Sequence, residues 1–269
     1  MIGAIIGDII GSKYEFNNIR TKEFSLLSEG CDYTDDSLMT IAVGRALLEW
    51  KDEDRDLERA TVAEMQAIGR KYPYPKGAYG GRFAGWLRSE HPMPYNSLGN
   101  GSAMRVSPCG EIAESVEEAR ELAKKTAAVT HNHPEGILGA QAVAEAIFLA
   151  RQGSSIPEIR KAMEQYYPLK QSLREIYDTY AYTETCAGTV PPAITAFLES
   201  ASFEDAVRNA VSLGGDCDTL TDITAAIAWA YYAYRGKDAC MQMLEEKALK
   251  MLPEELRKTV LAWETRFGK

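Results

Sequence analysis

The sequence predicts an all-α protein, a single compact multi-helix domain over residues 1–269, and three observations predict this class. Apolar residues recur at helical spacing through most of the chain. No segment shows a convincing alternation of apolar and polar residues, which is the pattern of a half-buried strand. The chain also has no internal repeat and no low-complexity linker that would divide it. One all-helical core is therefore the expected architecture.

The composition excludes several classes of protein. With 45% hydrophobic residues, the chain can bury a sizeable core. A net charge of −9 argues against strong nucleic-acid binding. The five cysteines are scattered and contain no CxxC pair, so we expect neither a disulfide framework nor a zinc site, and a cytoplasmic location. The apolar N-terminus is too short to span a bilayer and lacks the basic region of a signal peptide, so no membrane association is expected.

The first predicted helix begins at Ile2, where isoleucines recur at helical spacing as far as Ile10. Three glycines recur every four residues along another face: Gly3, Gly7 and Gly11. Because a glycine costs about 1 kcal/mol in a helix interior, this pattern indicates the close approach of another backbone or of a ligand. Asp8 lies in this helix, and Glu15 would share its face if the helix continued that far.

Residues 13–33 lose the helical period, and we expect them to form a lid or binding loop hinged at Glu15. A solvated surface loop is the alternative for the rest of this segment. The next helix is predicted over residues 36–50. A solvated turn of mixed charge should follow at residues 51–56, and then a second helix to about Arg70.

Residues 77–107 are predicted to be irregular because glycines are frequent there. Near their end lies the turn Gly99-Asn100-Gly101-Ser102, whose successive N–H groups could bind phosphate. The turn has neither the GKS/T of a Walker loop nor the GxGxxG spacing of a dinucleotide fold. An ordinary turn is the alternative.

The remaining helices follow from the apolar period and from prolines at first-turn positions. They are expected over residues 116–129, 134–151, 157–166, 173–182, 192–198, 203–213, 219–234, 238–249 and 253–267. The segment 219–234 is apolar nearly all round, which indicates a central buried helix. His131 and His133 are two residues apart, a poor spacing for one metal on a helix, so we reject zinc. Either a hydrogen-bonding role or a ligand contact remains open for these histidines.

Two clusters of acids and hydroxyls precede apolar helical runs. The first is Thr34-Asp35-Asp36-Ser37, where two adjacent carboxylates lie between two hydroxyls. A helix N-cap uses one such oxygen to accept the free N–H groups of the first turn, so capping leaves the other oxygens unexplained. Mg²⁺ and Mn²⁺ prefer carboxylate and hydroxyl oxygens. A divalent cation and simple capping are both compatible with this cluster taken alone.

The second cluster, Gly214-Gly215-Asp216-Cys217-Asp218-Thr219, has the same chemistry far downstream. If the fold brings the two helix ends together, the site holds four Asp and two Thr, enough oxygen for two cations that share a carboxylate. Four clustered carboxylates repel one another, and bound cations would offset that repulsion. The two clusters together predict a two-metal centre.

Five motifs are distributed in a fixed order over most of the chain. They are Gly7-Asp8 with Gly11 and Glu15, Tyr33-Thr34-Asp35-Asp36-Ser37, Gly99-Asn100-Gly101-Ser102-Ala103-Met104-Arg105, Thr130-His131, and Gly214-Gly215-Asp216-Cys217-Asp218-Thr219. In this combination the sequence resembles the ADP-ribosylglycohydrolase family. The resemblance departs at Ser37, where the family usually has Thr, and at Ala225 and Ala226, where it often has Gly.

The resemblance implies an all-helical ADP-ribosylglycohydrolase-like domain with two divalent cations, Mg²⁺ or Mn²⁺. The implied reaction is hydrolysis of the bond between C1″ of ADP-ribose and an acceptor, on an ADP-ribosylated protein or small molecule. The implied ligands of one cation are Thr34, Asp35 and Asp36, those of the other are Asp216 and Thr219, and Asp218 bridges the two. The acceptor, the choice of metal and the oligomeric state stay open.

Catalytic and substrate contacts are implied in the same way. The implied catalytic residues are Glu15, Asp36 and Asp218, with Glu15 as a mobile acid that is a proton donor, a metal ligand or both. The implied contacts of the diphosphate are Gly99, Asn100, Gly101, Ser102 and, nearby, His131. Two alternatives remain: a catalytically inactive ADP-ribose-binding or structural homologue, and a two-metal hydrolase of another ribosylated or phosphorylated metabolite.

Overall fold

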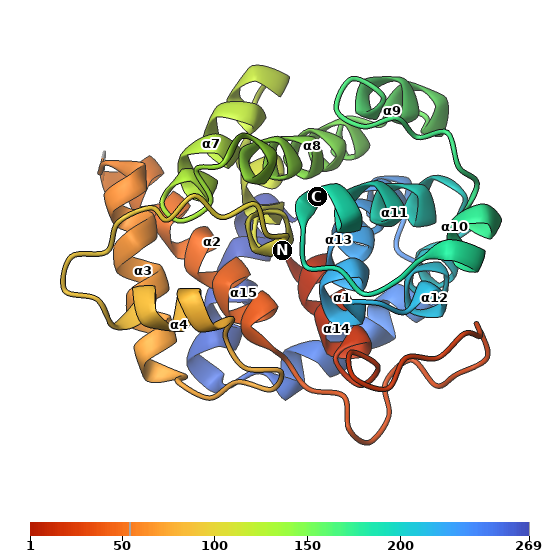
Figure 1. Cartoon of the computed structure of the whole chain (residues 1–269), viewed down its shortest axis with the longest axis horizontal. Coiled ribbons are helices and arrows are strands. Elements are labelled where there is room, and N and C mark those ends of the chain that lie inside the picture. Colours follow the sequence, from red (N-terminus) through yellow and green to blue (C-terminus); the bar gives the residue numbers. More distant parts are fainter. Residues whose placement is uncertain (54, 269) are drawn as a thin grey trace.

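The computed structural model describes residues 1–53 and 55–268, and their regular secondary structure is helical (Figure 1). The described residues contain no β-strand, only two isolated bridges, Thr34 with Lys76 and Gly99 with Thr185. The helices are α1 (Ile2–Gly11), α2 (Asp35–Glu53), α3 (Leu57–Lys71), α4 (Gly81–Arg88), α5 (Gly101–Met104), α6 (Ser107–Ile112), α7 (Val116–Ala128), α8 (Pro134–Arg151), α9 (Ile156–Met163), α10 (Leu173–Thr179), α11 (Cys186–Leu198), α12 (Phe203–Leu213), α13 (Cys217–Arg235), α14 (Ala239–Met251) and α15 (Glu254–Phe267). The all-α prediction is confirmed.

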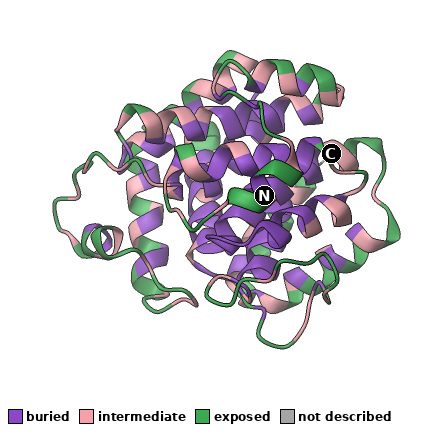
Figure 2. Cartoon of the chain, turned by 45° about the vertical axis from the view of Figure 1, so that its right-hand side comes forward, coloured by how far each residue is buried: buried purple, intermediate pink, exposed green. Residues whose placement is uncertain are grey.

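Helix α13 is the centre of the fold. It packs against α1, α8, α11 and α12, and its residues from Cys217 to Ala230 are all buried. Figure 2 shows the buried residues gathered in the interior, with exposed residues on the outer helices and loops. The prediction of a central buried helix over residues 219–234 is therefore confirmed for most of its length.

Helix α1 packs against α13 through its glycine face, as the sequence predicts. A Cβ added to Gly7 would lie 2.7 Å from the Cβ of Ala225, and one added to Gly11 would lie 2.5 Å from the carbonyl oxygen of Cys217. Both distances are too short for carbon, so only glycine permits this approach. Close packing of the two backbones brings Asp8 of α1 beside Asp218 of α13.

The segment 77–107 is more regular than predicted. It contains the short helices α4 and α5, and α6 begins at its last residue, although the sequence predicts irregular structure there. Glycines weaken the helical pattern of this segment, but packing overrides that weakness: α5 and α6 both lie against α8.

Helix α11 also begins earlier than predicted. The sequence places its start near Pro192, because proline is favoured in a first turn, whereas the helix begins at Cys186 and contains Pro191 and Pro192. The hydroxyl of Thr185 caps this start and accepts the N–H of Gly188 at 3.2 Å. The predicted lengths of α9 and α10 are about three residues too long at the C-terminal end.

The predicted turn at residues 51–56 is partly wrong. Helix α2 continues through residues 51–53, all exposed, while Asp54 lies outside the described residues. Helix α1 ends at Gly11, so Glu15 does not continue its face and lies in the turn that follows.

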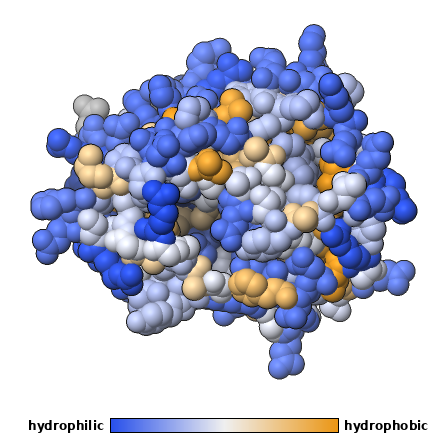
Figure 3. Space-filling view, viewed as in Figure 1, coloured by the Kyte–Doolittle hydropathy of each residue, from blue (hydrophilic) through white to orange (hydrophobic). Residues whose placement is uncertain are grey.

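The surface is mostly hydrophilic on the face seen in Figure 3, where hydrophobic side chains form small separate patches. Among the helices that the structure describes, none is long and apolar enough to cross a membrane. All five cysteines are free thiols, four of them buried.

Candidate active site

A cavity of about 500 Å³ opens where the first residues of α2 and α13 meet the short helix α5. Its carboxylate lining consists of Glu15, Asp35, Asp36, Glu184, Asp216 and Asp218. The lining also includes the loop from Gly99 to Gly101 with Arg105 and His131. Aromatic side chains complete the walls: Phe16, Tyr79, Phe83, Tyr95 and Tyr182. The fold thus brings together the two acid clusters and the glycine-rich turn.

Asp8 fixes the start of α2 relative to α1. Its Oδ2 accepts the N–H of Thr34 at 2.9 Å and the N–H of Ser37 at 3.1 Å, and its Oδ1 accepts the Thr34 hydroxyl at 2.7 Å. The Ser37 hydroxyl donates to the same carboxylate. These bonds satisfy donors that a helix start leaves free. A carboxylate from a distant segment therefore caps α2 and orients Asp35 and Asp36.

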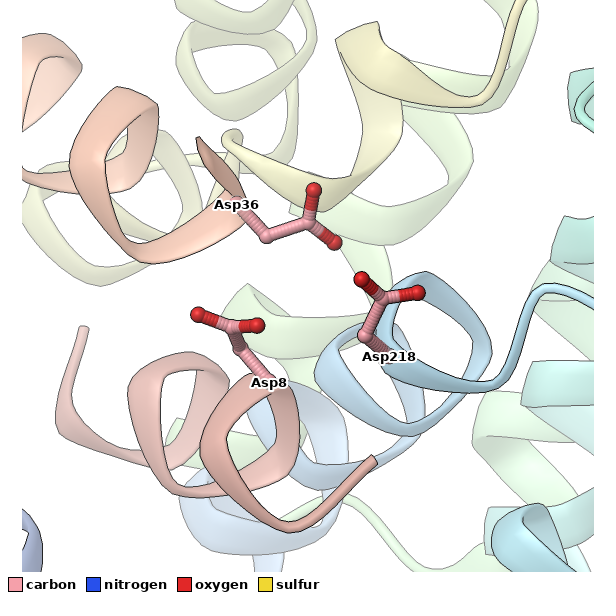
Figure 4. Close-up of side chains that lie close together, drawn as sticks. All are labelled: Asp8, Asp36 and Asp218. Carbon is pink, nitrogen blue, oxygen red and sulfur yellow. The ribbon is translucent and has the colours of Figure 1, made fainter. Parts of the chain in front are cut away.

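Two groups of three carboxylates share Asp218. The carboxylates of Asp8, Asp36 and Asp218 offer oxygens within 4.8 Å of one another, and so do those of Glu15, Asp216 and Asp218. Figure 4 shows Asp8, Asp36 and Asp218 pointing toward one another from three separate helices. One carboxylate between two acidic groups is the arrangement expected where two cations share a ligand.

Burial and mutual repulsion make this cluster unfavourable in its charged form. The pKa values of Asp36 and Asp218 lie well above the ordinary range, because both are buried and both face other carboxylates. Burial also raises the pKa of Asp8 and that of Asp216 to about 6, even though each accepts hydrogen bonds. Added positive charge would therefore favour the ionised form of these groups.

Glu15 lies at the edge of the cluster, half-buried. Its pKa is raised to about 8 by burial and by the charges of Asp218 and Asp8. Its Oε2 is buried and has no hydrogen-bond partner among the described residues. A buried carboxylate oxygen without a donor is costly, so this atom is suited to a cation, a water or a substrate proton.

The glycine-rich turn is held by the protein on its outer side. The N–H of Asn100 donates to the carbonyl of Glu184 at 2.8 Å, and the N–H of Gly99 donates to Ser97 Oγ at 3.2 Å. The Ser102 hydroxyl donates to the carbonyl of Gly136 at 2.7 Å. Two of the four predicted N–H groups are thus already paired. The N–H groups of Gly101 and Ser102 lie in the first turn of α5, where the helix itself provides no carbonyl to accept them.

Asn100 links the two ends of the cavity. Its Nδ2 donates to Asp216 Oδ2 at 2.6 Å and to Thr189 Oγ1 at 3.1 Å. Its side chain is therefore engaged with a predicted metal ligand, while the substrate contact that the sequence predicts for Asn100 is one of the backbone. Its backbone still borders the cavity.

His131 closes the loop end. It is buried, lines the cavity, and its Nδ1 lies 2.7 Å from Thr130 Oγ1. The guanidinium of Arg105 donates to the same hydroxyl at 2.9 Å. Burial and the charge of Arg105 hold the pKa of His131 well below its usual range, so the ring is neutral.

The predicted metal ligands differ in whether they reach the cavity. Asp35, Asp36, Asp216, Asp218 and Thr219 line the cavity, whereas Thr34 is fully buried and does not. The Thr34 hydroxyl donates to Asp8 and accepts the N–H of Asp36 at 3.1 Å. Thr219 donates its hydroxyl to Asp36 Oδ2 at 2.8 Å.

Sequence reasoning missed several residues of the site. Asp8 and Arg105 belong to the quoted motifs but received no role. Asp222 was not noticed, although it lies one helical turn after Asp218 on an apolar helix, which is the signal that could have found it. It is fully buried, and within the part of the chain that the structure describes neither carboxylate oxygen has a hydrogen-bond partner.

The donor set fits hard divalent cations. It consists of carboxylates with neighbouring Thr hydroxyls, without cysteine or histidine in either group of three. The buried Glu15 Oε2, which has no hydrogen-bond partner among the described residues, offers a further oxygen to such a cation. The residues present are therefore suited to Mg²⁺ or Mn²⁺.

Comparisons with known proteins show the family of this chain. The profile of the ADP-ribosylglycohydrolase family matches residues 1–262. The chain is 25% identical to ADP-ribosylhydrolase ARH3 of Homo sapiens, over 86% of this chain and 84% of that protein. It is also 25% identical to ADP-ribosylarginine hydrolase Tri1 of Pseudomonas putida, over 88% and 70% of the two chains.

A solved structure described as an ADP-ribosylglycohydrolase-related protein complex has the same fold. It superposes with a TM-score of 0.71 and 21% identity, covering 98% of this chain and 95% of that one. The family match spans nearly the whole sequence, so the chain belongs to the ADP-ribosylglycohydrolase family.

Proposed function

We propose that this protein is a hydrolase that depends on two divalent cations, Mg²⁺ or Mn²⁺, and cleaves the bond between ADP-ribose and an acceptor. One observation carries the proposal: two groups of three carboxylates share Asp218, and all of these acids except Asp8 line the same cavity as a glycine-rich turn. The relatives named ADP-ribosylhydrolases support the same reaction class.

The cavity matches the two chemical parts of ADP-ribose. The carboxylate end would take the distal ribose, because carboxylates and bound cations are partners for sugar hydroxyls. The loop end offers the N–H groups at the start of α5 to a diphosphate, and His131 lies in the same part of the cavity lining. A substrate with hydroxyls at one end and phosphate in the middle therefore has a complementary wall for each.

The cations would be held by residues of the cavity lining: Asp35, Asp36, Asp216, Asp218 and Thr219. Asp8 would support them indirectly, because its carboxylate accepts hydrogen bonds from Thr34 and Ser37 at the start of α2. Bound there, they would supply positive charge to the clustered carboxylates and lower the pKa of nearby water. This chemistry suits hydrolysis at a sugar C1, where the transition state resembles an oxocarbenium ion.

The chain's own residues supply the proton transfer and the enclosure. Glu15 has a carboxyl oxygen in the cavity without a hydrogen-bond partner among the described residues, so it is placed to exchange a proton with a leaving group or a water. The aromatic walls formed by Tyr79, Phe83 and Tyr95 limit access of bulk water.

The test is release of free ADP-ribose from a small panel of substrates. The panel contains ADP-ribosylated arginine peptide, ADP-ribosylated serine peptide, ADP-ribosylated DNA and O-acetyl-ADP-ribose, each with Mg²⁺, Mn²⁺ or EDTA. We expect release from at least one substrate that EDTA abolishes and added cation restores. A folded protein that binds cation and ADP-ribose but cleaves nothing in the panel would instead support a binding role.

A further inference from the structure

We propose that Arg105 and Thr130 are positioning residues that fix His131 as the tautomer with its proton on Nε2, so that a neutral N–H faces the glycine-rich turn. The sequence supplies these residues in two separate motifs, and the fold joins them beneath the loop end of the cavity. The inference deepens the proposed function, on which its ligand depends, because it assigns a donor for the diphosphate.

The direction of each hydrogen bond follows from what the groups can donate. The Arg105 guanidinium has only N–H donors and no acceptor, so its Nη2 donates to Thr130 Oγ1 at 2.9 Å. The threonine hydroxyl has one proton of its own. Its other partner is His131 Nδ1 at 2.7 Å. The hydroxyl proton therefore points to Nδ1.

This direction determines the histidine tautomer. If Nδ1 carried the ring proton, two donors, Arg105 and His131, would point at the Thr130 oxygen, and the hydroxyl proton would have no acceptor among the described residues. With Nδ1 as acceptor, the hydroxyl proton of Thr130 and the Nη2 donor of Arg105 both have partners, at 2.7 and 2.9 Å. A neutral imidazole then carries its proton on Nε2.

The Nε2 atom faces the turn. A Cβ added to Gly101 would lie 3.3 Å from Nε2, and one added to Gly99 would lie 3.4 Å from it. The ring is thus directed at the backbone of both glycines, on the wall of the cavity. Any side chain at these two positions would crowd the N–H group and the space in front of it.

Arg105 is itself fixed. It is 2% exposed, and its Nη1 donates to the carbonyl of Gly101 at 2.6 Å. The planar, charged guanidinium therefore holds both the turn and the Thr130 hydroxyl through hydrogen bonds. The same charge, with burial, keeps His131 neutral. A neutral ring can offer one N–H to a phosphate oxygen without gaining or losing a proton as pH changes near neutrality.

The first experiment measures the tautomer directly, on ligand-free protein. The chain has only three histidines, so ¹⁵N NMR of the imidazole nitrogens resolves them, and His131→Gln assigns the signal. We expect wild-type His131 to show a protonated Nε2 and an unprotonated Nδ1 at pH 7. Thr130→Val should lose this preference, and Thr130→Ser should restore it. A wild-type ring protonated on Nδ1, or on both nitrogens, overturns the proposal.

The second experiment measures what the tautomer does. Isothermal titration with ADP-ribose should show about tenfold weaker binding for Thr130→Val, the loss expected for one hydrogen bond to a charged oxygen. Thr130→Ser should bind within about twofold of wild type by the same reasoning. Equal binding by wild type and Thr130→Val, with both proteins folded, overturns the positioning role.

The two arms separate this inference from the proposed function. If wild-type protein shows the Nε2 tautomer but has no affinity for ADP-ribose, the proposed function fails while the assignment of the tautomer holds. If it binds and hydrolyses an ADP-ribosylated substrate but the tautomer is wrong, the function holds and this inference fails.

Discussion

The two ends of the cavity differ in how the protein completes them. At the carboxylate end, Asp36, Asp216 and Asp218 crowd together with raised pKa values, and Glu15 keeps a buried oxygen without a partner among the described residues. At the loop end most polar groups are paired by the chain itself, and Arg105 Nε is the exception. There Asn100, Ser102 and Thr130 each make hydrogen bonds to protein atoms.

The comparison indicates that the carboxylate end needs a bound ligand to balance its charge, whereas the loop end is already held in place by hydrogen bonds within the protein. Repulsion among carboxylates is relieved by protons or cations. A preformed hydrogen-bonded turn needs no reorganisation when substrate arrives. Substitutions at the first end should therefore change cation binding and rate, and substitutions at the second should change stability and substrate affinity.

The largest effect is expected at the shared carboxylate. Asp218→Asn should lower kcat/KM by about a thousandfold or more, because one change removes a ligand from both groups of three. Unlike most core substitutions, it should leave the melting temperature in EDTA unchanged or raise it, since it removes repulsion. Activity assays with Mn²⁺ and thermal unfolding in EDTA check both effects. Near-normal activity would contradict the metal assignment.

The next effect concerns the helix contact that carries the carboxylate end. Gly7→Ala should destabilise the protein by about 1–3 kcal/mol, the typical cost of overpacking a tight core, because its Cβ would lie 2.7 Å from that of Ala225. The matched control is Gly85→Ala in α4, where an added Cβ meets nothing within 4 Å.

In a helix, glycine is less favourable than alanine by about 1 kcal/mol, so the control should be neutral or stabilising. Urea unfolding of both variants measures the difference. Equal stability of the two variants would show that the close approach of α1 and α13 is not a constraint.

A smaller effect links cation binding to pH. The pKa values of Asp216, about 6, and Glu15, about 8, are raised in the cation-free protein, so protons compete with cations for these sites. The stability that a raised pKa contributes is present at low pH and is lost as pH rises through the folded value. The gain in melting temperature on adding Mg²⁺ should therefore grow from pH 5 to pH 8. At a hundred times the dissociation constant, the stabilisation is about 2.7 kcal/mol. A gain that shrinks with pH would argue against carboxylate ligands.

The smallest effect is predicted at the loop end. Ser102→Ala removes a buried hydroxyl that donates to Gly136 at 2.7 Å, and should cost about 1 kcal/mol of stability. The response of the melting temperature to Mg²⁺ should stay as in wild type, because Ser102 is not among the carboxylates of the other end. A changed response to Mg²⁺ would show that the two ends are not independent.

Much of the fold could be predicted because long apolar helices have a strong period. The starts of α2 and α13, and the glycine face of α1, follow from local sequence. The start of α11 could not be predicted, because Pro191 and Pro192 normally mark a first turn and here lie inside the helix. Short helices such as α5 depend on packing against α8, which local sequence does not reveal.

The candidate site was predictable in part for a related reason. Acids at helix starts are visible in the sequence, and so the two clusters were found. The role of Asp8 is not visible in the sequence, since its four donors come from Thr34, which precedes α2, and from Ser37 in the first turn of α2. The bonds from Arg105 through Thr130 to His131 likewise exist only once the fold has joined two motifs.

The glycine contact between α1 and α13 also sets a register. Gly3, Gly7 and Gly11 of α1 contact Trp229, Thr221 and Cys217 of α13, respectively. The residue numbers rise along α1 and fall along α13, so the two helices run antiparallel, and these contacts fix one register. A slip by one turn would move Asp8 by about 5.4 Å along its axis. That displacement exceeds the 4.8 Å within which Asp8, Asp36 and Asp218 gather. The small residues in the core thus determine the relative position of α1 and α13. The distances between the carboxylates of the cavity therefore depend on packing that lies outside the cavity.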